Sequence, residues 1–130
     1  MKALLPPGWP RPKGYANGIA ARGRIVVTAG VVGWNAREEF ETDDLAGQFR
    51  QVLANTLAIL AVDGAGPEHI VRMTCYVTDI AAYRDGLAGI GAAWRELMGK
   101  NFPAMAVVGV TALVEPMARI EIETMAVVPE

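Results

Sequence analysis

Two glutamates near the end of the chain are the residues whose spacing could support acid–base chemistry. Glu121 and Glu123 alternate with Ile120, Ile122 and Thr124, and side chains of a β-strand point to opposite faces with a period of two. The carboxylates therefore share one face, opposite the apolar residues. A carboxylate in a partly apolar cleft can donate or accept a proton near neutral pH. We expect a second subunit to cover this face; a solvated surface is the alternative.

Other catalytic and metal-binding arrangements lack the residues they need. His69 is the only histidine and Cys75 the only cysteine. Zinc would therefore have to rely largely on carboxylates, a catalytic triad has no second histidine to support it, and an internal disulfide cannot form. We expect His69 to be structural at the start of a strand and Cys75 to be a buried, inert thiol. The segments 14–18 and 30–33 lack the Lys-Ser/Thr of a phosphate-binding loop. The sequence predicts neither a metal nor a cofactor.

Charge and composition restrict the partners. The net charge is −2 and the 12 Lys and Arg residues form no basic run, so nothing favours nucleic acid. No apolar stretch approaches the roughly 20 residues that span a bilayer, and we expect a cytoplasmic protein. Hydrophobic residues make up 52 % of the chain and charged residues only 20 %. This excess predicts a face buried between subunits.

A single domain over residues 1–130 is expected, with residues 1–14 as a proline-rich extended arm. Apolar residues at three- and four-residue steps then predict two helices. The first follows Thr42 as N-cap and ends near Gly64, and the second follows Asp79 as N-cap and ends at Gly99. The two apolar stripes are Leu45, Phe49, Val52, Leu53, Leu57 and Leu60, and Tyr83, Leu87, Ile90, Trp94 and Leu97.

The remaining segments alternate as strands. We expect a hairpin of residues 16–21 and 24–30, whose second strand is buried on both faces because Ile25, Val26 and Val27 are consecutive. A strand over 70–77 and a terminal pair with its turn at Glu115-Pro116 complete the set. The order β-β-α-β-α-β-β predicts an α+β fold with a mixed sheet and two helices on one face.

Several segments, in this order, resemble the Rid family of reactive intermediate deaminases, also described as endoribonuclease L-PSP-like. They are the Tyr15 segment, Ile25–Gly30, Val71–Asp79, Phe102–Met105 and Ile120–Glu123. The resemblance implies a chorismate-mutase-like α+β fold and a homotrimeric barrel with clefts between subunits. Active members of the family hydrolyse enamines and imines, such as those derived from 2-aminoacrylate, to keto acids and ammonia.

The resemblance also implies roles for individual residues. Glu121 corresponds to the family's water-positioning glutamate, and Tyr15 to its N-terminal tyrosine. Met105 stands where the family has an arginine that binds the substrate carboxylate as a bidentate fork. Loss of a charge-assisted contact worth about 1.5–3 kcal/mol implies a substrate unlike 2-aminoacrylate.

Two other parts of the chain also differ from the family pattern. Ala29-Gly30-Val31 replaces a common Ser-Gly-Gln, and Ala88 replaces an asparagine. Trp34 either lines the cleft or closes a loop. With Glu121 as the catalytic residue, the expected substrate-binding residues are Tyr15, Ala29, Gly30, Val31, Trp34, Ala88, Met105 and Val107.

Two functions remain open for this cleft. One is hydrolytic deamination of an enamine, an imine or a related small metabolite between the subunits of a homotrimer. The other is a non-catalytic trimer that binds a small molecule. An endoribonuclease ranks third, because the acidic net charge and the single histidine argue against it.

Overall fold

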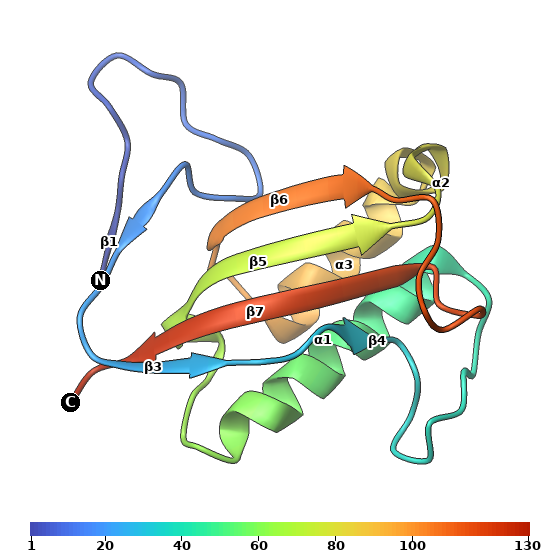
Figure 1. Cartoon of the computed structure of the whole chain (residues 1–130). Helices are drawn as coiled ribbons and strands as arrows, with labels where there is room; N and C mark the ends of the chain where they lie inside the picture. Colours follow the sequence, from blue (N-terminus) through green and yellow to red (C-terminus); the bar gives the residue numbers. More distant parts are fainter.

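A computed structural model describes all 130 residues and contains a mixed five-stranded sheet with its helices on one face (Figure 1). The path of the sheet is β3 (Arg24–Val27), β7 (Ile120–Val128), β5 (Ile70–Val77) and β6 (Ala104–Gly109), and β4 (Val31–Val32) pairs further along β7. Only β5 and β6 are parallel. The helices are α1 (Leu45–Ala61), α2 (Ile80–Asp85) and α3 (Leu87–Leu97), and the 3₁₀ turn is Pro67–His69. The predicted α+β class is confirmed, and no helix is both long and apolar enough to cross a bilayer.

The hairpin expected from residues 16–30 is wrong. β2 (Ile19–Ala20) pairs instead with β1 (Lys2–Ala3) of the N-terminal arm, and β3 pairs with β7. Gly23 has φ +145°, and a Cβ at this position would collide with the carbonyl oxygen of Val128. The glycine therefore serves the close approach of the chain to β7, not a hairpin turn.

Burial of β3 on both faces is also wrong for the chain taken alone. Val26 packs against the core, whereas Ile25 and Val27 are 65 % and 61 % exposed. The helices cover only one face of the sheet, so alternate residues of this edge strand point away from them.

The terminal strands are likewise not a pair, because β5 lies between β6 and β7. β6 runs parallel to β5 and β7 antiparallel to it. The segment 110–119 therefore crosses one strand instead of forming a tight turn at Glu115-Pro116.

The N-termini of α1 and α2 each follow an aspartate. The carboxylate of Asp44, not Thr42, caps α1 by accepting from Gly47 N at 2.9 Å, and Asp79 caps α2 by accepting from Ala82 N at 3.1 Å. The second predicted helix is divided at Gly86, which ends α2 and begins α3.

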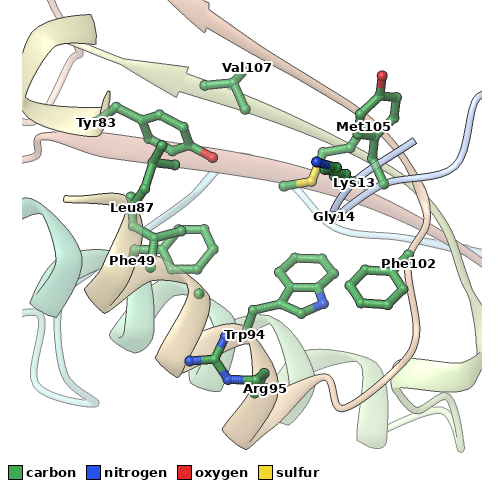
Figure 2. A pocket seen from close by; sticks show the side chains of 13 residues that line it. Lys13, Gly14, Phe49, Tyr83, Leu87, Trp94, Arg95, Phe102, Met105 and Val107 are labelled. Carbon is green, nitrogen blue, oxygen red and sulfur yellow. The ribbon is translucent and has the colours of Figure 1, made fainter. Parts of the chain in front are cut away.

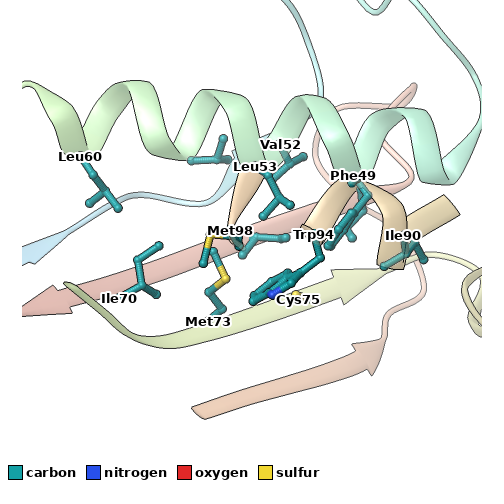
Figure 3. Close-up of a cluster of buried hydrophobic side chains, with 14 of the residues drawn as sticks. Phe49, Val52, Leu53, Leu60, Ile70, Met73, Cys75, Ile90, Trp94 and Met98 are labelled. Atoms are coloured by element: carbon teal, nitrogen blue, oxygen red, sulfur yellow. The ribbon is translucent and has the colours of Figure 1, made fainter. Parts of the chain in front are cut away.

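The hydrophobic core lies between the sheet and helices α1 and α3 (Figure 3). Ile120 and Ile122 are fully buried in it, which confirms the alternation predicted for β7. In β5 a bulge shifts the register between Ile70 and Arg72, and Ile70 is buried whereas Val71 is only half-buried. Cys75 is fully buried as expected, and burial raises the pKa of its thiol to about 12.

Candidate functional site

The register of the sheet divides the predicted site residues between its two faces. Met105 pairs with Met73, and Val107 pairs with Cys75. Met73 and Cys75 are fully buried beneath the helices. Because paired residues of neighbouring strands point to the same face, Met105 and Val107 lie on the helix side.

Glu121 lies on the other side. It pairs with Tyr76, and Glu123 pairs with Thr74, so these four residues share the face that no helix covers. We call this the open face; its exposed apolar members are Ile25, Val27, Val108 and Met125. The hydroxyl of Tyr76 donates to Glu123 Oε1 at 2.5 Å, and this hydrogen bond raises the pKa of Tyr76. Glu123 is therefore engaged, and Glu121 is the available carboxylate.

A cavity of about 450 Å³ opens on the helix side, between β6, α3 and the N-terminal segment (Figure 2). We call it the aromatic pocket. Met105, Val107 and Tyr15 line it, as do Phe49, Trp94 and Phe102. Its lining contains Lys13 and Arg95 but no Asp or Glu, and neither cation forms an ion pair.

Backbone contacts position the mouth of this pocket. Ala16 N donates to the carbonyl oxygen of Pro103 at 2.9 Å, and Ala16 bridges Ala104 in parallel. This short extension of the sheet holds Tyr15 beside the start of β6. Apart from that contact β6 is an edge strand, so the pocket opens beside unpaired backbone.

Aromatic packing forms the interior of the pocket. The Trp94 ring stacks between Phe49, with centroids 6.5 Å apart, and Phe102, with centroids 6.2 Å apart. The indole Nε1 of Trp94 is buried and has no hydrogen-bond partner. A buried donor without an acceptor costs about 1–3 kcal/mol, so the chain alone leaves this group unsatisfied.

Gly30 and Glu121 are in direct contact on the open face. A Cβ at position 30 would collide with Glu121 Oε2, so the carboxylate lies over the glycine backbone. Glu121 is partly buried and forms no ion pair; Arg119 pairs with Asp43 at 2.8 Å. The acid–base candidate thus lies against the glycine backbone and has no charged partner within the chain.

Most of the other predicted residues lie apart from the aromatic pocket, and Gly30 connects them to Glu121. Ala29, Gly30, Val31 and Trp34 line a second hollow of about 430 Å³ beside α1. The carbonyl oxygen of Trp34 accepts from Asn55 Nδ2 at 2.7 Å, so this loop is fastened to the helix. Ala88 is exposed on α3 and lines neither cavity.

Sequence reasoning assigned Phe49 and Trp94 to the core stripes and did not consider Lys13 or Arg95. A helical stripe shows which residues face the sheet, but not where the packing against it leaves a space. Gly91 was the one signal in the sequence that could have indicated the pocket. Its lack of a side chain leaves room for the Arg95 guanidinium at the pocket wall. No group of three or more His, Cys, Asp or Glu side chains is placed to hold a metal ion.

Similarity to known proteins extends over nearly the whole chain. A sequence model of the family described as Endoribonuclease L-PSP matches residues 10–128. The chain is similar to YyfB from Yersinia pestis, a Rid-family protein described as being of unknown function, with 32 % identity, a TM-score of 0.85 and 98 % of each chain covered.

Two further solved structures are similar. Rv2704 from Mycobacterium tuberculosis, a member of the YjgF/YER057c/UK114 family, is 34 % identical, with a TM-score of 0.67 and coverage of 89 % of this chain and 88 % of that chain. The YjgF gene product from E. coli is 30 % identical, with a TM-score of 0.68 and 98 % of each chain covered. No curated protein matches the chain.

Proposed function

This chain belongs to the Rid family, and from that premise we propose that it hydrolyses the C=N bond of a small imine, or of an enamine through its imine tautomer, in a cleft between two copies of itself. The proposal depends on the surroundings of the Glu121 carboxylate. Its carboxylate is partly buried, lies over Gly30 and has no hydrogen-bond or ion-pair partner. Such a group is available to exchange a proton with a bound water.

The proposed reaction is a hydration followed by an elimination. Glu121 accepts a proton as water adds to the carbon of the protonated imine, which gives a carbinolamine. The carboxyl returns this proton to nitrogen, the C–N bond breaks, and ammonia leaves as the C=O bond forms. The carboxylate takes up the proton of the carbinolamine hydroxyl in this step and releases it to solvent. One water is consumed for each imine converted to a carbonyl compound and ammonia.

A second copy of the chain is part of the proposal because Met105 and Glu121 lie on opposite faces. Within one chain the aromatic pocket cannot face the carboxylate. The open face exposes Ile25, Val27 and Met125, as expected of a surface buried between subunits. In the proposed homotrimer these faces pack together, and the β6 edge of one copy lies beside Glu121 of the next.

The experiment is ammonia release from enzymatically generated 2-aminoacrylate and 2-iminobutyrate. We expect Glu121→Gln to lower the rate by about 10²- to 10⁴-fold, the usual contribution of a general acid–base group. Glu123→Gln is the matched control, since it removes a carboxylate two residues along the same face, and should stay within about threefold of the native rate. Equal activity of the native chain and Glu121→Gln would contradict the proposal.

A non-catalytic ligand-binding trimer is the second candidate, and the absence of a cation at position 105 favours it. Met105→Arg separates the two functions. If only this variant acts on the small imino acids, the carboxylate machinery is intact and the native substrate differs. If neither the native chain nor the variant acts on any imine, the binding function is favoured. Ribonuclease activity is not proposed, because the net charge of −2 provides no basic surface for RNA.

A further inference from the structure

The volume of the aromatic pocket argues for a ligand larger than a three-carbon imine. Its volume of about 450 Å³ lies in the range of cavities that enclose whole metabolites, about 300–1,000 Å³. A molecule of six or seven heavy atoms would leave most of this apolar space empty. Trp94 and Phe102 instead offer aromatic surfaces that suit a planar, apolar group, and the buried Phe49 supports Trp94.

The buried indole N–H of Trp94 needs a hydrogen-bond acceptor. The side chain is 7 % exposed, and its Nε1 has no partner. Phe102 does not satisfy this donor, because the two rings lie within 7° of parallel and the N–H lies in the indole plane. Figure 2 draws Nε1 on the side that faces Phe102. Phe102 is 42 % exposed, so a small displacement of its ring would admit an acceptor.

The charged residues that line the aromatic pocket favour an anionic ligand. Lys13 and Arg95 are the charged residues of the pocket, and no carboxylate accompanies them. Arg95 folds onto its own helix, with Nη1 3.3 Å from the position a Cβ of Gly91 would occupy. Lys13 lies on the Met105 side of the pocket in Figure 2, beside the open edge of β6.

We propose that the pocket selects an aromatic 2-imino acid whose ring carries a hydrogen-bond acceptor, with the carboxylate at Lys13 and the ring acceptor at Trp94 Nε1. The inference rests on the proposed function, which makes the ligand an imine. In a 2-imino acid the reacting carbon bears the carboxylate, so that end must stay at the mouth, where Glu121 of a second copy could reach it. The side chain then extends inward toward Trp94, and Phe102 lies at its edge.

Binding of non-reacting keto acids tests the assignment without turnover. We expect 4-hydroxyphenylpyruvate to bind the native trimer more tightly than phenylpyruvate by about 3- to 10-fold, the value of one neutral hydrogen bond. Both should bind at least about tenfold more tightly than pyruvate, which lacks the ring. Trp94→Phe should remove the difference between the two aromatic ligands. In the native chain, the indole N–H resonance missing from Trp94→Phe should shift when 4-hydroxyphenylpyruvate is added.

Removal of single positive charges tests the proposed contact between the ligand carboxylate and Lys13. Lys13→Met should weaken phenylpyruvate binding by about tenfold or more and leave 1-phenylpropan-2-one, which lacks the carboxylate, unaffected. Lys2→Met removes a charge from the same arm outside the pocket and should change neither. Loss of phenylpyruvate binding in Arg95→Met but not in Lys13→Met would overturn the assignment of Lys13.

Two results separate this inference from the proposed function. If the chain hydrolyses small imines but binds pyruvate as tightly as the aromatic keto acids, the substrate class is wrong and the hydrolysis stands. If the aromatic keto acids bind as expected and no imine of any size is hydrolysed, the ligand assignment stands and the catalytic proposal fails.

Discussion

Met105 and Glu121 point to opposite sides of one sheet, from strands β6 and β7 that are separated by β5. The pleat alternates side chains strictly, so no rotamer change brings the two residues together in one chain. A site that uses both must take them from different copies. The structure thus presents two halves, an apolar pocket at an open strand edge and a carboxylate on an uncovered face.

The first prediction concerns assembly through the open face. Val27→Lys should convert the proposed trimer to monomers, because it would put a long charged side chain into a closely packed interface. Light scattering coupled to size-exclusion chromatography measures the mass directly. Val62→Lys is the control, since Val62 is 89 % exposed at the end of α1 and lies off the sheet. A Val27→Lys chain of native mass would show that this face is not the interface.

The second prediction uses the contact between Gly30 and Glu121. In Gly30→Ala the new Cβ displaces the end of a flexible side chain, so the fold should persist, with the free energy of unfolding changed by less than about 1 kcal/mol. The turnover number should fall by about tenfold or more, because the carboxylate is moved.

Gly33→Ala provides the contrast to this substitution. There a Cβ would lie 2.7 Å from the backbone oxygen of Gln48, which cannot turn aside, so unfolding should become easier by about 1–3 kcal/mol. Denaturant titration and the imine assay together distinguish the two effects. A Gly30→Ala chain of native activity would show that the position of Glu121 does not matter.

The third prediction is a pH dependence of stability that arises from Cys75. Burial raises the pKa of its thiol from 9.0 to about 12, so between these values the folded chain keeps a proton that the unfolded chain releases. The free energy of unfolding should therefore fall as the pH rises from about 9, by at most about 1.4 kcal/mol per pH unit from this group.

Urea titrations at pH 8 and pH 10 would measure this effect. Cys75→Ala should be less stable at both pH values and should show a shallower decline between them. An identical decline in both chains would assign the pH dependence to other groups.

The fourth prediction concerns Gln48, which is fully buried. Its Nε2 donates to the carbonyl oxygens of Thr42 and Met117, and its Oε1 accepts from Arg119 N at 2.8 Å. Gln48→Leu would leave these three backbone groups unpaired, and should lower the free energy of unfolding by about 2–4 kcal/mol.

Gln51→Leu is the matched control for this loss. The side chain of Gln51 is partly exposed, and its Nε2 donates only to Asn55 Oδ1, so its replacement should cost less than about 1 kcal/mol. Equal effects of the two substitutions, measured by urea denaturation, would contradict the role assigned to Gln48.

Local periodicity was sufficient for much of the fold. The alternation of Ile120 and Ile122 with Glu121 placed the carboxylate on the uncovered face correctly, because the pleat depends only on neighbouring residues. The stripe from Leu45 to Leu60 located α1, and Asp79 located the start of α2, since both signals act within a few residues. The C-terminal residues also carried a family resemblance that the comparisons confirm.

Strand pairing could not be predicted in the same way. The segment around Gly23 has the composition of a hairpin turn, and its local pattern does not distinguish that turn from an approach to β7, about a hundred residues later in the chain. For the same reason β6 and β7 looked like neighbours. Which strands pair depends on long-range burial, and an alternating strand presents the same pattern to any partner.

The sequence by itself determined the family, the α+β class, the main helix and the side of the sheet on which Glu121 lies, because each follows from local spacing or from a matching motif. Only the tertiary structure decided that Met105 faces away from Glu121 and that Trp94 and Lys13 line one pocket. These relationships join residues from separate elements, and the order of the strands and the packing of α3 on the sheet set them.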